Sequence, residues 1–235
     1  IRDSLSTDLE AVEKLYLSSE LPPCFQIMPH VQPAGLDDAL AARSYRKEGE
    51  SLVQCCDLEG SEAPGDVELS DRPSAGWLAQ LSAGGNPAVG AAKAAILARA
   101  EGPKVYAALG PEAAPKAIGI GLRAGDTAWV NSMYTRPDVR GQGLAGRILA
   151  AIAHWSLEAG LSRLYLQVEK DNSPARHLYE RFGFRPLYPY HSRCLAPSSA
   201  SRCGAGENAG RMAGENAGRM AGESAGRMAG ESAEC

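Results

Sequence analysis

A glycine-rich stretch in the middle of the chain has the residue types needed to hold an anion. Arg140-Gly-Gln-Gly-Leu-Ala145 follows a β-like run at Trp129–Thr135 and leads into a long amphipathic pattern at Leu144–Ala159. Glycine lets the backbone approach a ligand closely, and a helix start offers unpaired N–H groups and the positive end of a dipole. The stretch therefore predicts a site for a phosphate or pyrophosphate, held by the backbone N–H groups of residues 140–145.

A dinucleotide is one ligand that this site could hold. Gly141-Gln-Gly-Leu-Ala-Gly146 matches the G-x-G-x-x-G fingerprint of NAD(P)-binding Rossmann proteins, and Glu169 follows at a suitable distance. In that fold, however, the first glycine directly follows a buried parallel strand. Here residues 136–140 intervene, and the preceding runs, Ala117–Leu122 and Ala128–Tyr134, resemble an antiparallel hairpin. The Rossmann interpretation is therefore the weaker one.

A second motif favours a different cofactor. It reads Asn172-Ser-Pro-Ala-Arg-His-Leu-Tyr179 and is followed by a Gly-Phe turn at 183–184, with a strand-like run at Leu164–Val168 before it. The two motifs, in this order, resemble the Arg/Gln-x-x-Gly-x-Gly/Ala and Asn-x-x-Ala-x-x-x-Tyr signatures of the GCN5-related N-acetyltransferases (GNAT). The resemblance covers residues 67–193, a little over half of the chain.

This resemblance implies an acetyl-CoA-dependent N-acetyltransferase that uses no metal and transfers the acetyl group directly to an amine. It implies that backbone groups of 133–135 pair with the pantetheine arm, and that 140–145 hold the pyrophosphate. Asn172 is expected to bond to backbone or to CoA. The residues expected to bind the co-substrate are Met133, Tyr134, Thr135, Arg140, Gly141, Gln142, Gly143, Leu144, Ala145, Asn172 and Ala175.

Tyr179 stands where the family places its general acid. A phenol, with a reference pKa of about 10, stays protonated until charge develops on the leaving thiolate. The alternative is a tyrosine that only packs on a helix face with Leu178 and Phe182. The motif around it favours the catalytic role.

The general base is left open by the sequence. Some relatives carry Glu five residues before the motif Asn, but this chain has Gln167 there, which cannot usefully accept a proton. Glu169, two residues further on, would point to the same face of a regular strand as Gln167. His191, whose imidazole can accept a proton, lies on the last predicted strand. Glu169, His191 and a water chain all remain candidates.

Elements that could position these residues can be placed along the chain. Residues 1–62 predict a small α/β segment, interpreted as a degenerate half-copy of the GNAT fold without a cofactor site. Residues 66–195 predict the acetyltransferase domain, an α/β fold with a mixed, largely antiparallel sheet flanked by helices. Its predicted helices and strands are 67–69, 75–81, 87–100, 104–109, 117–122, 128–135, 144–159, 164–168, 174–182 and 185–193.

The end of the chain differs in composition from the rest. From Ala205 an eight-residue unit, Ala-Gly-Glu-Asn-Ala-Gly-Arg-Met, recurs with small changes. Glycine at every fourth position disfavours a helix by about 1 kcal/mol each, more than the Glu–Arg pairs return. Residues 196–235 therefore predict a low-complexity, disordered tail.

Composition narrows the possible partners and location. A net charge of −4 argues against a nucleic-acid partner, and no apolar run reaches the length of a membrane span. The six cysteines lack metal-ligand spacing, so we expect free thiols in the cytoplasm. The expected partner is an amine on a small molecule or a protein. A non-catalytic acyl-CoA-binding module is the alternative function, because Gln167 replaces the expected acid.

Overall fold

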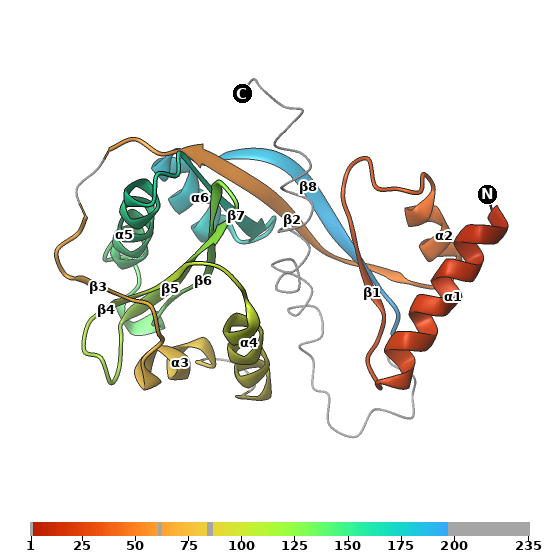
Figure 1. Ribbon diagram of the computed structural model, residues 1–235, viewed down its shortest axis with the longest axis horizontal. Coiled ribbons are helices and arrows are strands. Elements are labelled where there is room, and N and C mark those ends of the chain that lie inside the picture. Colours follow the sequence, from red (N-terminus) through yellow and green to blue (C-terminus); the bar gives the residue numbers. More distant parts are fainter. Residues whose placement is uncertain (1, 61–62, 84–86, 197–235) are drawn as a thin grey trace. The chain divides into compact units, whose positions relative to one another are not determined.

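The computed structural model describes residues 2–60, 63–83 and 87–196 (Figure 1). In chain order the elements are α1 (Arg2–Ser18), β1 (Cys24–Ile27), α2 (Leu36–Ala42), β2 (Arg46–Asp57), β3 (Val67–Ser70), α3 (Ala75–Leu81), α4 (Pro87–Arg99), β4 (Lys104–Leu109), β5 (Ala117–Ala124), β6 (Thr127–Thr135), the 3₁₀ turn η1 (Pro137–Val139), α5 (Leu144–Glu158), β7 (Arg163–Glu169), α6 (Ser173–Phe182) and β8 (Arg185–Cys194). The described residues form two compact units, which are taken in turn.

The larger unit comprises residues 53–168 and 172–187, and it contains both sequence motifs. Its sheet follows the strand order β7-β6-β5-β4-β3, with the end of β2 beside β7. Strands β3 to β6 pair antiparallel, and β6 pairs parallel with β7 across the connection through α5. The predicted fold class, a largely antiparallel sheet flanked by helices, is confirmed. A doubly wound parallel sheet, which the Rossmann interpretation requires, is not what these pairings form.

Two glycines bring α5 close to one face of this sheet. A methyl group on Gly119 would lie 2.6 Å from Met133 Sδ and 2.7 Å from Ile148 Cγ2. A methyl on Gly121 would lie 2.8 Å from Ile152 Cγ2. Because β5 has no side chains at these positions, the apolar face of α5 packs directly on the strand, and Ile148 and Ile152 are fully buried.

Helices α3 and α4 cover the other face. Trp77 and Leu97 pack with Ile118 and Ile120 in a buried cluster, and the Trp77 indole N–H donates to Ala107 O at 3.1 Å. Ser74 caps α3 by accepting from the Trp77 backbone N–H. The helix therefore begins at Ala75, where the sequence predicts it to begin.

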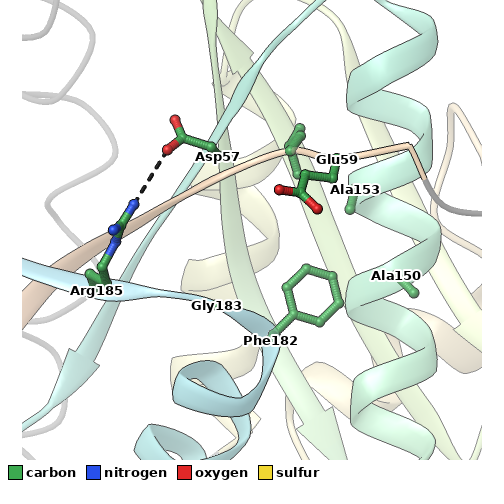
Figure 2. A pocket seen from close by; sticks show the side chains of 8 residues that line it. Asp57, Glu59, Ala150, Ala153, Phe182, Gly183 and Arg185 are labelled. Carbon is green, nitrogen blue, oxygen red and sulfur yellow. Dashed lines mark hydrogen bonds and ion pairs between the residues drawn. The ribbon is translucent and has the colours of Figure 1, made fainter. Parts of the chain in front are cut away.

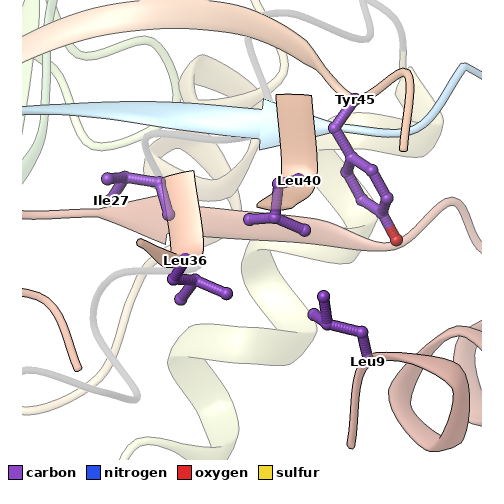
Figure 3. Packing of buried hydrophobic residues seen from close by; sticks show 5 residues of the cluster. All are labelled: Leu9, Ile27, Leu36, Leu40 and Tyr45. Atoms are coloured by element: carbon purple, nitrogen blue, oxygen red, sulfur yellow. The ribbon is translucent and has the colours of Figure 1, made fainter. Parts of the chain in front are cut away.

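The smaller unit comprises the described residues 2–52, 169–171 and 188–196. Its core is a cluster of buried residues from α1, β1, α2 and the residue before β2 (Figure 3): Leu9, Ile27, Leu36, Leu40 and Tyr45. Arg43 donates to both carboxylate oxygens of Glu13 at 3.1 Å and ties the end of α2 to α1. Strand β1 pairs antiparallel with the end of β8.

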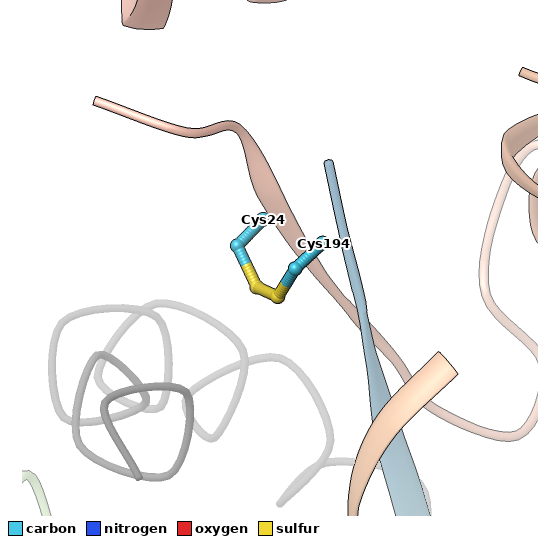
Figure 4. Close-up of a disulfide and its surroundings, with 2 residues drawn as sticks. All are labelled: Cys24 and Cys194. Carbon is cyan, nitrogen blue, oxygen red and sulfur yellow. A yellow bond between two sulfur atoms is a disulfide. The ribbon is translucent and has the colours of Figure 1, made fainter. Parts of the chain in front are cut away.

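A disulfide joins Cys24 of β1 to Cys194 of β8 (Figure 4). The two residues lie directly opposite each other in the antiparallel register, with their Cα atoms 4.1 Å apart. The expectation that all cysteines are free thiols is therefore wrong for this pair, because a long-range strand pairing, invisible in the sequence, brings them together. Cys55 and Cys56 are buried and are not joined in a disulfide.

The compact units divide the chain differently from the predicted boundary at 62–66. Residues 53–57 of β2 belong to the larger unit, and residues 188–194 of β8 belong to the smaller one. The division into 1–62 and 66–195 therefore stays a proposal about ancestry. The repeats of the predicted tail lie outside the described residues, as do Cys203 and Cys235. None of the helices in the described residues is long and apolar enough to cross a membrane.

Candidate active site

Strand β6 carries an extra residue at the edge predicted to meet the pantetheine arm. Ile118 of β5 lies opposite Tyr134, yet Ile120 lies opposite Asn131, so β6 is one residue longer over this span. Ser132, inside the span, has a φ of 50°, and its N–H donates to Asn131 Oδ1 at 2.8 Å. Such a bulge bends a strand and changes its pairing.

The pairing of β6 with β7 stops just before this bulge. It runs from Ala128 opposite Leu164 to Val130 opposite Leu166. Beyond Val130, β6 stays paired with β5 through Thr135, but within the described residues its other edge has no further register partner on β7. The two parallel strands therefore separate. The half-buried residues 133–135 present a strand edge to which an extended ligand could add.

The chain then turns sharply before the glycine-rich stretch. Arg136 holds Asp138 with two hydrogen bonds, Nε to Oδ1 at 3.1 Å and a terminal nitrogen to Oδ2 at 2.6 Å. Arg140 reaches back across η1, and its Nε donates to Thr135 O at 3.2 Å. The Arg140 backbone N–H donates to Pro137 O at 3.5 Å, so this donor already has a protein partner.

A run of backbone donors without partners begins at Gly141. Within the described part of the chain, none of the N–H groups from Gly141 to Gly146 donates to a protein acceptor. Intrahelical bonding of α5 starts at Arg147, which donates to Gly143 O at 3.2 Å. Gly143 is the N-cap of α5 and provides no side-chain cap. Successive unpaired N–H groups at a helix start form a concave site for an anion.

Glycine is required in this run for its backbone conformation. Gly141 and Gly143 have φ values of 78° and 76°, in the left-handed region. Apart from the adjoining residues, no atom of the described residues lies within 4 Å of where a side-chain carbon would stand at either glycine. The space over the N–H groups is therefore open, and the residues of the cradle, 141–146, fit a pyrophosphate.

Helix α6 packs beside the cradle. A methyl on Gly146 would lie 3.6 Å from Leu178 Cδ1, so the two helices meet one residue before Tyr179. The Tyr179 ring is buried and contacts Phe184 edge to face at a centroid distance of 5.7 Å. Burial raises the pKa of the Tyr179 phenol to about 12. The ring packs against Phe184, while its hydroxyl stays protonated as an acid must.

Asn172 and Ala175 are joined at the start of α6. Asn172 is the N-cap, and its Oδ1 accepts from the Ala175 backbone N–H at 3.2 Å. Of the two expectations for Asn172, bonding to backbone is the one that the structure contains. The spacing of Asn and Ala in the motif is therefore explained by a helix cap, which fixes where α6 begins.

The candidate bases fall in different places. Gln167 is half-buried on β7, in the larger unit. Glu169 is an exposed residue at the end of β7, and His191 lies on β8, both in the smaller unit. A His191 ring nitrogen lies 3.0 Å from Asp37 Oδ1, a partner that the sequence did not predict. Within the described residues, no group of three or more His, Cys, Asp or Glu could hold a metal ion.

Sequence reasoning missed the bulge at Ser132 and the return contact of Arg140. The only signal for the bulge is the polar pair Asn131-Ser132, which interrupts the apolar alternation of β6. Asn side chains often hydrogen-bond to nearby backbone groups, as Asn131 Oδ1 does here by accepting from the Ser132 N–H.

Comparison with known proteins decides the family. Residues 50–184, more than half of the 235-residue chain, match the model of the acetyltransferase (GNAT) family. The chain belongs to the GNAT family. It is therefore an N-acetyltransferase enzyme, and the matched region includes the GNAT cradle, the open β6 edge and Tyr179.

Similar proteins carry related names. The chain is 28% identical over 193 residues to the uncharacterized N-acetyltransferase YobR of Bacillus subtilis, covering 79% of this chain and 77% of that one. It is 30% identical over 91 residues to thialysine N-epsilon-acetyltransferase of Bos taurus, covering 36% and 54%. It is 37% identical over 81 residues to mycothiol acetyltransferase of Corynebacterium aurimucosum, covering 32% and 27%. The matches to the latter two span about half and about a quarter of their lengths.

Solved GNAT structures share the fold. A GCN5-related N-acetyltransferase from Kribbella flavida gives a TM-score of 0.56 at 18% identity, covering 82% of this chain and 76% of that one. One from Sphaerobacter thermophilus gives a TM-score of 0.55 at 16% identity, covering 76% and 62%. At such identities the likeness supports the architecture of the GNAT chain and leaves its acceptor unassigned.

Proposed function

We propose that this enzyme transfers the acetyl group of acetyl-CoA directly to a primary amine. The observation that carries the proposal is the run of unpartnered N–H groups at 141–146, next to the open edge of β6 at 133–135. A pyrophosphate needs the first feature, and an extended pantetheine arm carrying amide groups needs the second.

Binding is divided between these two features. The N–H groups of Gly141–Ala145 hold the pyrophosphate, aided by the positive end of the α5 dipole. The backbone of Met133 and Tyr134 pairs with the amides of the pantetheine arm. Arg140 acts mainly by holding the turn through Thr135 O, which keeps the cradle in line with the strand edge.

The reaction forms one bond and breaks one. The amine nitrogen attacks the thioester carbonyl carbon, the carbon–sulfur bond breaks, and the sulfur leaves with the electron pair. Tyr179 gives its hydroxyl proton to that sulfur, and a pKa raised to about 12 by burial keeps the proton in place until then. The nitrogen keeps the acetyl group and loses its extra proton to water as the amide forms, and the phenolate regains a proton from solvent.

The amine must lose a proton before it can attack. Gln167 occupies the position of the acid found in some relatives and cannot take this proton. We propose that water carries it away, with Glu169 and His191 as the side-chain alternatives. Water needs no fixed acceptor beside the amine, which agrees with the presence of Gln167.

The acceptor is proposed from the names of the relatives. The bovine relative is named for thialysine, a small molecule with a primary amine, and it matches 91 residues of this chain. A primary amine on a flexible chain is therefore the first acceptor class to test.

The N-terminal segment is proposed to be a degenerate half-copy of the same fold. Its order β1–α2–β2 repeats the order β7–α6–β8, and it has no stretch like Arg140–Ala145. We propose a supporting role for it.

The test is product detection by mass spectrometry. The full chain is incubated with acetyl-CoA and each of thialysine, lysine and glucosamine, and CoA binding is measured in parallel by calorimetry. The proposal expects acetylated amine with at least one acceptor. CoA binding without transfer to any member of a wide amine panel would instead support a non-catalytic acyl-CoA-binding module.

A further inference from the structure

A cavity of about 440 Å³ lies in the larger unit (Figure 2). Its walls come from the segment after β2, the middle of α5 and the turn that follows α6. None of the residues assigned above to acetyl-CoA lines it. Its size suits a small organic molecule.

The charges in this cavity differ in how they are matched. Asp57 accepts from Arg163 Nε at 3.0 Å and from an Arg185 terminal nitrogen at 3.4 Å, so two guanidinium groups share its negative charge. Glu59 has no hydrogen bond or ion pair with any residue in the described part of the chain. The Glu59 carboxylate is therefore the acceptor in the cavity that has no protein partner.

On the side of the cavity formed by α5 and Phe182, the neighbours of Glu59 are apolar. Figure 2 shows its carboxylate directed toward the Phe182 ring, with Ala150 and Ala153 of α5 beside them. A carboxylate beside an aromatic ring is complementary to an organic ammonium group, because the carboxylate attracts its charge and the ring can attract its polarised C–H and N–H groups. The alanine wall leaves room for a short alkyl chain.

We propose that this cavity binds a small alkylammonium ion, with the ammonium group at Glu59 and Phe182 and the alkyl chain along Ala150 and Ala153. The site is separate from the cradle, and it does not depend on the function proposed above. The expected dissociation constant is on the order of 1 mM, because a solvated ion pair and one cation–π contact each contribute little.

The test is a titration of the full chain, carrying ¹³C-labelled alanine methyl groups, with n-butylammonium chloride. Butan-1-ol and sodium butyrate serve as neutral and anionic probes of similar length. The proposal expects the Ala150 and Ala153 methyl resonances to move with butylammonium only. Equal shifts with butan-1-ol would overturn it, since the cavity would then be an apolar crevice without charge selection.

A matched pair of variants locates the charge. Glu59→Gln keeps the shape and should weaken butylammonium binding about fivefold, while Glu68→Gln, at an exposed residue of β3, should leave it unchanged. Saturating CoA should not abolish the Ala150 and Ala153 shifts. Loss of those shifts with CoA would place the ammonium at the acceptor site instead, and so overturn the proposal while supporting the acetyltransferase site.

Discussion

At the scale of single residues, the cradle rests on glycines in the left-handed region. Gly141→Leu should weaken acetyl-CoA binding at least about tenfold, because a side chain would stand over the free N–H groups. It should also cost about 1–2 kcal/mol of unfolding free energy from the strained φ of 78°. Calorimetry with acetyl-CoA and urea unfolding measure the two effects separately.

Gly125→Leu is the matched control for that substitution. Gly125 also has a positive φ, 62°, and open space around it, but it lies in the β5–β6 turn. It should lose similar stability and keep acetyl-CoA binding. If both variants bind acetyl-CoA alike, the free N–H groups at 141–146 do not hold the pyrophosphate.

Tyr179→Phe tests the proton donor. The variant should lose about 10²-fold in kcat and keep its KM for acetyl-CoA. Because the pKa of Tyr179 is raised to about 12, the wild-type phenol stays protonated at pH 7 to 10. If kcat falls between pH 7 and pH 10, the fall should therefore have the same pH dependence in the wild type and in Tyr179→Phe.

The control for this variant is another buried tyrosine. Tyr106→Phe, in the cluster under α3, should leave kcat unchanged. Unchanged turnover in Tyr179→Phe, or an alkaline limb that this variant removes, would eliminate Tyr179 as the acid.

At the scale of secondary-structure elements, contact of α5 with β5 positions the cradle. Gly119→Ala should lower the free energy of unfolding by about 1–3 kcal/mol, because its methyl would overlap Met133 and Ile148. Ile148→Ala removes the Cγ2 atom that the methyl would overlap, so it should cost less in the Gly119→Ala chain than in the wild type, and the two changes would not be additive in urea unfolding. Simple additivity would show that the methyl is accommodated elsewhere.

The smaller unit has its own pH-dependent contact, between α2 and β8. The hydrogen bond from Arg193, followed by that from His191, lowers the pKa of Asp37 to about 2. A lowered carboxyl pKa stabilises the fold above the unfolded value, and this stability is lost as pH falls toward about 2. Asp37→Asn should therefore cost about 1 kcal/mol at pH 7, discounted because the Asp37 side chain is 36% exposed, and almost nothing near pH 2.

Asp38→Asn is the comparison for this variant, because Asp38 shares the first turn of α2. Urea unfolding is measured from pH 7 to pH 2. The difference in unfolding free energy between wild type and Asp37→Asn should disappear toward pH 2, whereas the difference for Asp38→Asn should be small throughout. If the difference for Asp37→Asn does not change with pH, the contact with Arg193 does not stabilise the ionised carboxylate.

Most of these elements could be predicted from local patterns. Apolar periodicity indicates helices α3 and α5, and Gly160 marks the end of α5. The Gly125-Asp126 turn indicates the β5–β6 hairpin. The bulge at Ser132 was not predicted, because it depends on which strand lies alongside, whereas the cap of α3 at Ser74 is a local contact with the Trp77 N–H. The Asp37 contact joins residues more than 150 positions apart, and nothing local indicates it.

At the scale of the whole molecule, pairings between distant segments escaped prediction. The sequence predicted separate segments, yet β2 and β8 contribute residues to both units. The disulfide between Cys24 and Cys194 results from one such pairing. The site could be predicted because its two motifs are local, whereas strand order depends on contacts over the whole chain.

The central claim is that acetyl-CoA binds at 141–146, and ligand-dependent thermal stability tests it most directly. The full chain is melted with acetyl-CoA or NADPH in excess, alongside Gly141→Leu. We expect acetyl-CoA at a hundred times its dissociation constant to raise the wild-type Tm by on the order of 5 °C. NADPH should have no effect, and the variant should lose the shift. A rise in Tm with NADPH alone, or no rise with either ligand, would contradict binding of acetyl-CoA at this site.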